Sequence, residues 1–199
     1  LETEWETIRD EARAALDART VPLIEQVVGR AQGNRGEWRT FVLVAHHTPV
    51  DFNAGLCPRT SELLADVPGL QSALFSVFAP GTHLPAHRAP NRGVLRYHLG
   101  LIVPEPGSCR LRVGDRTLDY AEGQSILFDD VYEHEAWNVG TAPRVTLLLE
   151  AIRPLPALQR QLNALTQRAF SLYPEARGAV ERLDRLEWQL NGNRRYRRG

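Results

Sequence analysis

Hydrophobic positions change their spacing twice along this chain of 199 residues. From Glu2 to Asp17 apolar residues recur every three or four positions, which predicts one amphipathic helix with a single buried stripe. Between Leu70 and Ile152 short apolar runs alternate with turn residues, and after Pro154 the helical spacing returns. The pattern therefore predicts a β-rich centre with helices on both sides of it.

The β-rich centre divides into eight short strands, with turns of Gly, Pro, Asn and Asp between them and no helices. This spacing is typical of an antiparallel sandwich or barrel of the jelly-roll type, so we expect a mainly β fold with flanking helices. The strands are predicted at Leu70–Ala79, His83–Arg88, Leu95–Val103, Cys109–Val113, Arg116–Tyr120, Gln124–Phe128, Glu133–Asn138 and Pro143–Ile152.

No repeat, low-complexity segment or long linker divides the chain, which predicts a single domain over residues 1–199. Within it we expect an N-terminal extension (1–66), a β core (67–153), and C-terminal helices with a basic tail (154–199). The extension is predicted to hold a strand at Trp38–Val44 and a short helix at Pro58–Ala65. One C-terminal helix is expected to carry Leu158, Leu162, Leu165 and Phe170 on one side, and another to run from about Pro174 to Leu190.

Composition narrows the possible functions. Formal net charge is zero, so charge alone indicates neither nucleic acid nor an anionic membrane as a default partner. All 24 basic residues are Arg, which excludes a Walker-type phosphate loop and a lysine Schiff base. Cys57 and Cys109 are isolated, as expected for a reduced cytoplasmic protein. No apolar run approaches the ~20 residues of a membrane span, and the oligomeric state is left open.

Two histidines are the first candidates for chemistry. His87 ends one predicted strand and His134 begins another, so only tertiary folding can bring them together. Non-haem iron oxygenases bind their metal with two His, often with one carboxylate, and keep positions open for co-substrate and oxygen. The usual carboxylate position, two residues after the first His, is Ala89, which cannot bind a metal. Histidines that only make core hydrogen bonds are the alternative.

Arg96 and His98 share one face of their predicted strand because side chains alternate along it. Cationic groups inside a small barrel need a compensating anion. That anion is either a bound co-substrate or an internal carboxylate from Asp129, Asp130 or Glu133, and spacing alone leaves both open. Arg144 begins the last strand, where its planar guanidinium can bind a carboxylate through two parallel hydrogen bonds.

The chain resembles the aspartyl/asparaginyl β-hydroxylase family in Ser76–His83, in His87–Leu101, in Phe128–Asp130 followed by His134–Asn138, and at Arg144. The similarity extends from about Leu56 to Pro154. It implies a double-stranded β-helix and an oxygenase that uses Fe(II), 2-oxoglutarate and O2. Carried over by position, it implies iron ligation by His87 and His134, binding of the distal carboxylate of 2-oxoglutarate by Arg144 with help from Ser76, and co-substrate contacts from Arg96 and His98.

The same resemblance implies hydroxylation of an unactivated carbon, as in β-hydroxylation of an Asp- or Asn-type residue, a peptide or a small molecule. Bacterial members that hydroxylate lipid A and ornithine lipids have segments similar to Cys57–Thr60 and Leu95–Leu101, which makes a lipid acyl chain an alternative substrate. Where Ala89 stands, the Asp/Asn branch has Gly and lipid-modifying members can have Asp, so Ala89 favours the former. A small residue there is also how related halogenases admit chloride. A non-oxygenase, cupin-like metal-binding protein is the competing class.

Overall fold

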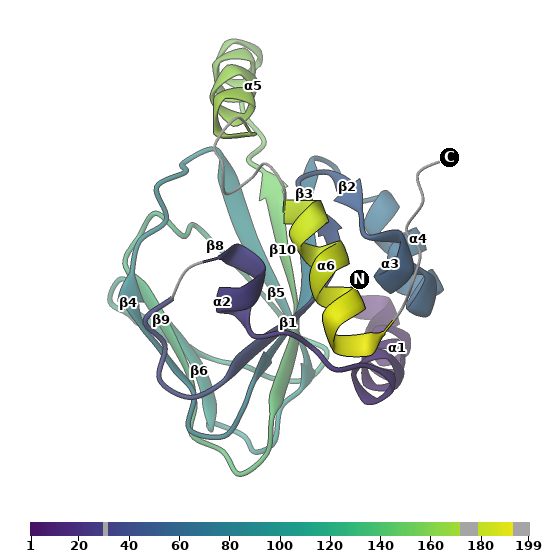
Figure 1. Ribbon diagram of the computed structural model, residues 1–199. Helices are drawn as coiled ribbons and strands as arrows, with labels where there is room; N and C mark the ends of the chain where they lie inside the picture. The colour runs from purple at the N-terminus through teal and green to yellow at the C-terminus, as the bar shows by residue number, and fades with distance from the viewer. Residues whose placement is uncertain (30–31, 172–178, 193–199) are drawn as a thin grey trace.

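Two antiparallel β-sheets form the body of the protein (Figure 1). The computed structural model describes residues 1–29, 32–171 and 179–192. The six-stranded sheet has the order β2-β1-β3-β10-β5-β8 and the four-stranded sheet the order β4-β9-β6-β7. The elements are η1 (Glu2–Glu4), α1 (Trp5–Ala18), α2 (Ile24–Val28), β1 (Trp38–Ala45), β2 (Thr48–Pro49), α3 (Asp51–Leu56), α4 (Pro58–Ala65), β3 (Leu70–Phe78), β4 (His83–His87), β5 (Val94–Ile102), β6 (Cys109–Val113), β7 (Arg116–Asp119), β8 (Ser125–Phe128), β9 (His134–Asn138), β10 (Arg144–Ile152), α5 (Ala157–Ser171) and α6 (Ala179–Asn191).

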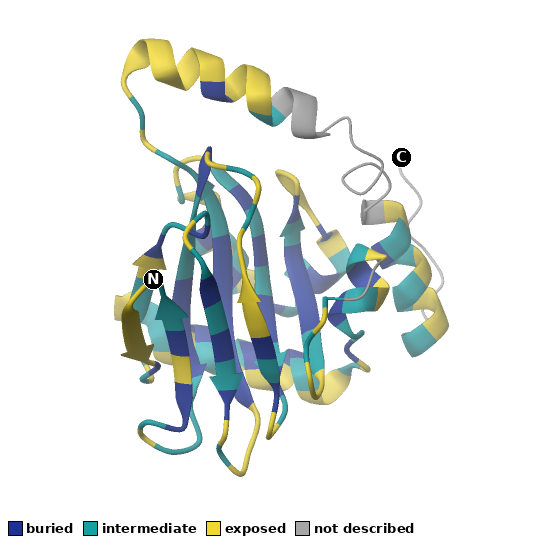
Figure 2. Ribbon diagram, turned by 90° about the vertical axis from the view of Figure 1, so that its left-hand side faces the viewer, coloured by how far each residue is buried: buried dark blue, intermediate teal, exposed yellow. Residues whose placement is uncertain are grey.

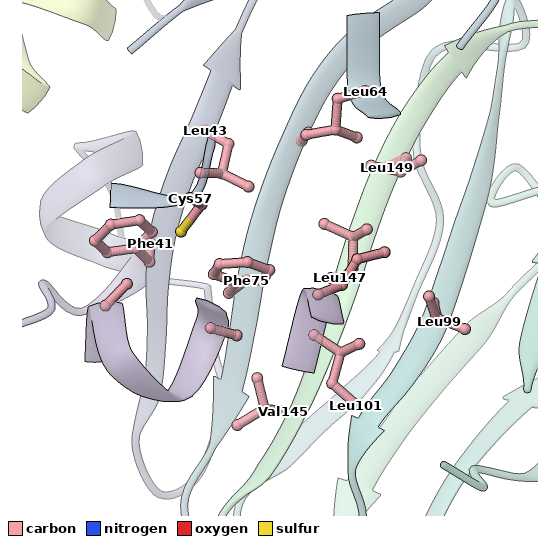
Figure 3. Packing of buried hydrophobic residues seen from close by; sticks show 14 of the residues in the cluster. Phe41, Leu43, Cys57, Leu64, Phe75, Leu99, Leu101, Val145, Leu147 and Leu149 are labelled. Carbon is pink, nitrogen blue, oxygen red and sulfur yellow. The ribbon is translucent and has the colours of Figure 1, made fainter. Parts of the chain in front are cut away.

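The outer face of the large sheet is apolar and packs against α1 and α4. Register places Phe41, Phe75, Leu147 and Leu99 side by side across four strands, and all four are buried (Figure 3). Alternation along a strand sends neighbouring residues to the opposite face. The inner face of the same strands is consequently free to carry different chemistry.

That inner face faces the small sheet, and one apolar cluster joins the two sheets. Phe78 and Phe128 of the large sheet pack there with Leu84, Leu111 and Ala136 of the small sheet. Polar side chains occupy the rest of the inner face, among them Ser76 and Arg144, which are both buried. Packing of two sheets over one core therefore encloses a polar interior next to an apolar one.

The predicted mainly β fold with flanking helices is confirmed, and its two facing antiparallel sheets are those of a jelly-roll, or double-stranded β-helix. Each of the eight predicted strands of the core is present with its ends shifted by at most a residue or so. Among the described residues, no helix has the length and hydrophobicity needed to cross a bilayer. Residues 174–178 of the last predicted helix, the basic tail at 193–199 and the side chain of Phe170 lie outside the described part.

The predicted strand at Trp38–Val44 is part of the large sheet and not only of an N-terminal extension. It forms β1, which pairs along its length with β3 inside the large sheet, so strand pairing crosses the predicted boundary at residue 67. Sequence spacing did not indicate β2 or α3, because both are short and follow the turn at His46 and His47, whose backbone φ angles are positive. The three-part division remains a prediction, with β1 belonging to the sheet.

Burial of Cys57 gives a test of the core. Its side chain is fully buried, and burial raises the pKa of the thiol to about 12 from 9.0. A thiol reagent should therefore leave native Cys57 unlabelled at neutral pH and label it after unfolding in urea. Above about pH 9 only the unfolded thiol ionises, so stability should fall with rising pH more steeply than in a Cys57→Ala variant. Urea unfolding at several pH values measures this. If the free energy of unfolding falls equally steeply with pH in both proteins, the pKa of Cys57 is not raised by folding.

Candidate metal and carboxylate site

His87 and His134 lie directly opposite each other on neighbouring antiparallel strands. His87 is the last residue of β4 and His134 the first of β9, and the sheet register pairs them. Their ring centroids are 4.1 Å apart. Strand pairing thus brings together at one point two imidazoles that are far apart in the sequence.

Both rings are held in the same tautomer by the backbone. The Nδ1 atom of His87 lies 2.9 Å from the carbonyl oxygen of Pro85, and Nδ1 of His134 lies 2.9 Å from that of Tyr132. Because a carbonyl oxygen only accepts hydrogen bonds, each Nδ1 carries the proton and Nε2 of the neutral ring keeps its lone pair. Burial also lowers the pKa of His134 and so favours the neutral ring. This is the arrangement of metal-ligating histidines, whose second nitrogen donates to the protein.

Two loops meet beside the histidine pair. The backbone N–H of Ala89 donates to the carbonyl oxygen of Asp130 at 2.9 Å, which ties the segment after His87 to the segment before His134. In the described part of the chain, no group of three or more His, Cys, Asp or Glu side chains is placed to hold a metal ion. A metal bound by His87 and His134 would therefore have two protein ligands among these residues.

The Asp130 side chain is buried next to this pair and is only half satisfied. Its Oδ2 accepts a hydrogen bond from Nε of Arg96 at 2.8 Å, whereas the buried Oδ1 has no partner in the described structure. The Asp130 charge is close enough to His134 to raise its pKa, although burial outweighs this effect. An acceptor without a donor thus lies near the two ring nitrogens that are free to bind a metal.

Arg96 has two carboxylate partners of its own. Besides Asp130, it contacts Glu150 on β10, with Nη2 2.6 Å from Oε1. The sequence left open whether Arg96 pairs with a bound co-substrate or with an internal carboxylate. The structure shows two internal carboxylates, Asp130, which was predicted, and Glu150, which was not. Contact between Arg96 and a co-substrate remains a prediction.

Removing the Asp130 carboxylate should destabilise the protein. An Asp130→Ala variant leaves Arg96 with one of its two carboxylates, and breaking a buried ion pair in this way costs about 3 kcal/mol in the free energy of unfolding. Asp119→Ala is the matched control, because Asp119 pairs with Arg110 in an exposed ion pair whose loss costs about 0.5 kcal/mol. Urea unfolding of the metal-free proteins measures both, and equal losses would mean that Asp130 holds no structural ion pair.

Arg144 is a buried cation that has no carboxylate partner among the described residues. Only 2% of its surface is exposed, and its guanidinium carbon lies 4.0 Å from the ring centroid of Phe78 and 4.6 Å from that of Tyr120. Both Nε and Nη1 are buried without a hydrogen-bond partner in the described chain. Burial lowers the pKa of Arg144, yet a guanidinium stays protonated at neutral pH. A charge in this position requires a bound anion to satisfy its free donors.

A row of hydroxyl groups crosses the inner face of the large sheet near Arg144. Register places Thr40, Ser76 and Thr146 side by side, and all three are buried. Ser76 Oγ accepts a hydrogen bond from the Trp38 indole at 3.0 Å, while Oγ1 of Thr40 and of Thr146 has no partner in the described chain. Sequence reasoning found Ser76 and missed the two threonines. Thr146 shares a strand face with Arg144 by its spacing of two, but its neighbours depend on register, which the sequence does not reveal.

His98 connects the two parts of the site. Its Nδ1 lies 2.7 Å from the hydroxyl oxygen of Tyr120, the residue that also packs on Arg144. Phe128 makes edge contacts with both His98 and His134, at centroid distances of 5.1 and 5.5 Å. Burial, followed by the positive charges of Arg144 and Arg96, holds the pKa of His98 well below its ordinary value, so its ring is neutral. Contacts through Tyr120, His98 and Phe128 thus join Arg144 to the histidine pair in one interior.

Comparisons with known proteins fit this architecture. The Aspartyl/Asparaginyl beta-hydroxylase family profile matches residues 2–154. The chain is 46% identical over 127 residues to an ornithine lipid ester-linked acyl 2-hydroxylase of Rhizobium tropici, covering 63% of this chain and 45% of that protein. It is 32% identical over 173 residues to the human aspartyl/asparaginyl beta-hydroxylase, covering 83% of this chain and 22% of the relative. The chain therefore spans less than half the length of either relative.

Solved structures with a similar arrangement of strands are distant in sequence. A predicted oxalate decarboxylase from Thermotoga maritima superposes with a TM-score of 0.46 and 12% identity, covering 69% of this chain and 96% of that one. The Cnp3 cupin domain of Schizosaccharomyces pombe gives a TM-score of 0.42 and 10% identity, with 66% and 74% covered.

Proposed function

Because this chain belongs to the aspartyl/asparaginyl β-hydroxylase family, we propose that it is an iron(II)- and 2-oxoglutarate-dependent hydroxylase with His87 and His134 as its metal ligands. One observation supports this proposal above the others. Arg144 is a buried cation with free donors, and it lies in the same interior as a histidine pair whose ring nitrogens are free. That combination meets the needs of a metal ion and of a dicarboxylate together.

His87 and His134 fit the demands of iron(II), because each ring donates from Nδ1 to a carbonyl oxygen and so directs Nε2 to a ligand. With 2-oxoglutarate and O2, iron(II) supplies hydroxylation of a C–H bond while the co-substrate becomes succinate and CO2. Ala89 leaves coordination positions open for small ligands. The unpaired Oδ1 of Asp130 is placed to accept a hydrogen bond from a donor in this region.

Arg144 fits the distal carboxylate of 2-oxoglutarate. Its guanidinium can donate through Nε and Nη1 at once, which fixes the orientation of a carboxylate. Hydroxyl groups of Ser76 and Thr146 provide further donors on the same sheet face. Phe78 and Tyr120 cover the guanidinium and exclude water, which strengthens its attraction for the anion.

Two substrate classes follow from different observations. Ala89 favours an Asp- or Asn-type residue, a peptide or a small molecule, since this position distinguishes the branches of the family. Identity of 46% with the ornithine lipid acyl hydroxylase favours a lipid acyl chain as the second candidate. Both reactions insert one oxygen atom into an unactivated C–H bond, so the proposed roles of His87, His134 and Arg144 are the same for each.

Calorimetry and product analysis test this proposal in two stages. Manganese-loaded protein, kept free of oxygen, should bind 2-oxoglutarate, and absence of binding would favour the non-oxygenase, cupin-like alternative. Iron-loaded protein should then convert 2-oxoglutarate to succinate in air when given substrate. Mass spectrometry of an Asp-containing peptide and of an ornithine lipid would show which gains one oxygen. Chlorine in the product when chloride is present would instead support halogenation.

A further inference from the structure

The helix α5 attaches to the protein by its polar side. Among its side chains at 157–167, which the structure describes, Asn163 is buried and Gln167 is half-buried, while every apolar side chain is exposed. Figure 2 shows α5 as a mostly exposed helix lying across one end of the strands. Most surface helices pack by an apolar stripe instead. Something other than apolar burial therefore fixes this part of α5 in place.

A closed network of amide groups joins α5 to the loop between β4 and β5. Asn163 donates from Nδ2 to the carbonyl oxygen of Gly93 at 2.9 Å and accepts from Nε2 of Gln167 at 3.0 Å. Gln167 and Asn91 each donate to the side-chain oxygen of the other at 3.0 Å. The backbone N–H of Gly93 also donates to Oδ1 of Asn91, at 2.9 Å. Each side-chain oxygen and nitrogen of Asn91, Asn163 and Gln167 thus has a partner, which defines one docked position for the helix.

Gly93 allows the helix to approach the loop closely. A β-carbon built on Gly93 would lie 1.9 Å from Oδ1 of Asn163 and 2.1 Å from Nε2 of Gln167. A side chain at this position would therefore occupy the space that the amide network fills. Docking of α5 depends on the absence of a side chain at residue 93.

Polar attachment makes α5 easy to release. A hydrogen bond between neutral amides contributes little net free energy, because water replaces it when it breaks. Release of the described side chains of α5 would expose no buried apolar group, so it avoids the main penalty for opening a packed helix. Pro154 and Pro156 separate β10 from α5, and neither has an N–H group with which to extend strand pairing. The connection between them is thus suited to act as a hinge.

The loop that α5 holds leads directly out of the histidine pair. It follows His87, the last residue of β4, and ends at β5, which carries Arg96 and His98. Within it, the N–H of Ala89 donates to the carbonyl oxygen of Asp130, four residues before His134. The loop, α5 and the segment between β10 and α5 also line a pocket of about 330 Å³, so the docked helix is loosely packed. Movement of α5 would therefore be felt by the loop next to His87.

We propose that α5 is a lid helix that docks and releases, and that its docked position orders the loop after His87. Release frees Asn91 and Gly93, so the loop can move away from the histidine pair, whereas docking holds both residues in place. For the hydroxylase proposed above, release would admit the substrate and docking would fix the loop during the reaction. That link to substrate rests on the proposed function. Movement of α5 does not, because it is measured without metal or substrate.

Hydrogen exchange followed by mass spectrometry tests the movement in the metal-free protein. A detached helix of this length is marginal in water, so backbone amides of α5 exchange when it is released. Urea below the unfolding transition should accelerate exchange in α5 much less than in α1, because opening of α1 exposes apolar surface. The helix α1 is a matched comparison, since it has 14 residues and α5 has 15, and it buries Ile8, Ala12 and Ala15. Equal urea dependence in the two helices would overturn the proposal.

Gln167→Ala opens the amide network from the helix side. Exchange in α5 should accelerate at least about tenfold and exchange in the loop at 88–93 should accelerate with it, although alanine raises the intrinsic helix propensity. Gln161→Ala is the control, because Gln161 is an exposed residue of the same helix and its change should leave the loop as in the wild type. Slower or unchanged exchange in α5 of Gln167→Ala would overturn the lid. Faster exchange in α5 with an unchanged loop would overturn the coupling to the loop.

Gly93→Ala displaces α5 without changing any residue of the helix. Its added methyl group should accelerate exchange in α5 at least about tenfold. Gly55→Ala is the control, since Gly55 lies in α3 and a β-carbon there meets nothing within 4 Å. Equal exchange in α5 of both variants would show that the amide network does not hold the helix and would overturn the proposal.

Substrate kinetics test the link between the lid and hydroxylation. Gln167→Ala should raise the KM for the Asp-containing peptide or the ornithine lipid, whichever is hydroxylated, at least about threefold and leave manganese affinity unchanged. An unchanged KM would overturn the role of α5 in substrate entry. Absence of hydroxylation in the wild type would contradict the proposed function, while the exchange rates would still decide whether α5 is a lid.

Discussion

Replacing Arg144 with methionine should abolish 2-oxoglutarate binding and leave the ligand-free protein at least as stable as the wild type. Arg144 is buried with two donor nitrogens unpaired, so it costs folding energy when no anion is bound. Methionine of similar length removes that buried charge and retains contact with Phe78 and Tyr120. Exchanging buried charge for apolar volume can raise the free energy of unfolding by about 1–4 kcal/mol.

Calorimetry with manganese-loaded protein and urea unfolding of ligand-free protein measure the two effects separately. Because Arg144→Met removes the buried charge that would pair with the co-substrate, affinity for 2-oxoglutarate should fall at least about 100-fold. Arg110→Met is the control, because Arg110 pairs with Asp119 at the surface and should affect neither quantity noticeably. If Arg144→Met instead lowers stability and keeps its affinity for 2-oxoglutarate, then Arg144 has a structural role and the co-substrate binds elsewhere.

Local patterns predicted the elements of this fold well, because strand ends coincide with Gly, Pro and Asp residues that the sequence displays. The sequence also identified the candidate residues His87, His98 and Arg144. Each has a definite position on a predicted strand and a side chain that seldom serves packing alone. The sequence did not show which strands pair or in which register. Tyr120 and Thr146 joined the candidate site only when the sheet register placed them beside Arg144 and Ser76.

Arg96 shows why a residue's strand face does not determine its partner. Alternation correctly placed it with His98, but Glu150, one of its two carboxylates, comes from the neighbouring strand β10 and was not considered.

His134 offers the second large effect. An His134→Ala variant should lose at least about 100-fold in affinity for manganese or iron(II), because only His87 would remain of the two facing imidazoles; even changes to groups that merely orient metal ligands cost 10–100-fold. Succinate formation should disappear with the metal. Electron paramagnetic resonance of free manganese measures the affinity, and circular dichroism confirms folding. Since His134 is buried, His134→Gln, which keeps a polar side chain of similar size, should show the same loss.

His83→Ala is the control that separates ligation from a general effect of losing a histidine. His83 lies on the same strand as His87 but pairs with Glu135, its Nε2 3.0 Å from Oε2. Because Nε2 of His83 is engaged by a carboxylate and its ring packs against Trp137, its variant should keep full metal affinity. Equal losses in the His83 and His134 variants would mean that β4 and β9 must pair correctly for any metal to bind. Undiminished affinity in His134→Ala would instead remove His134 from the ligand set and place the metal elsewhere.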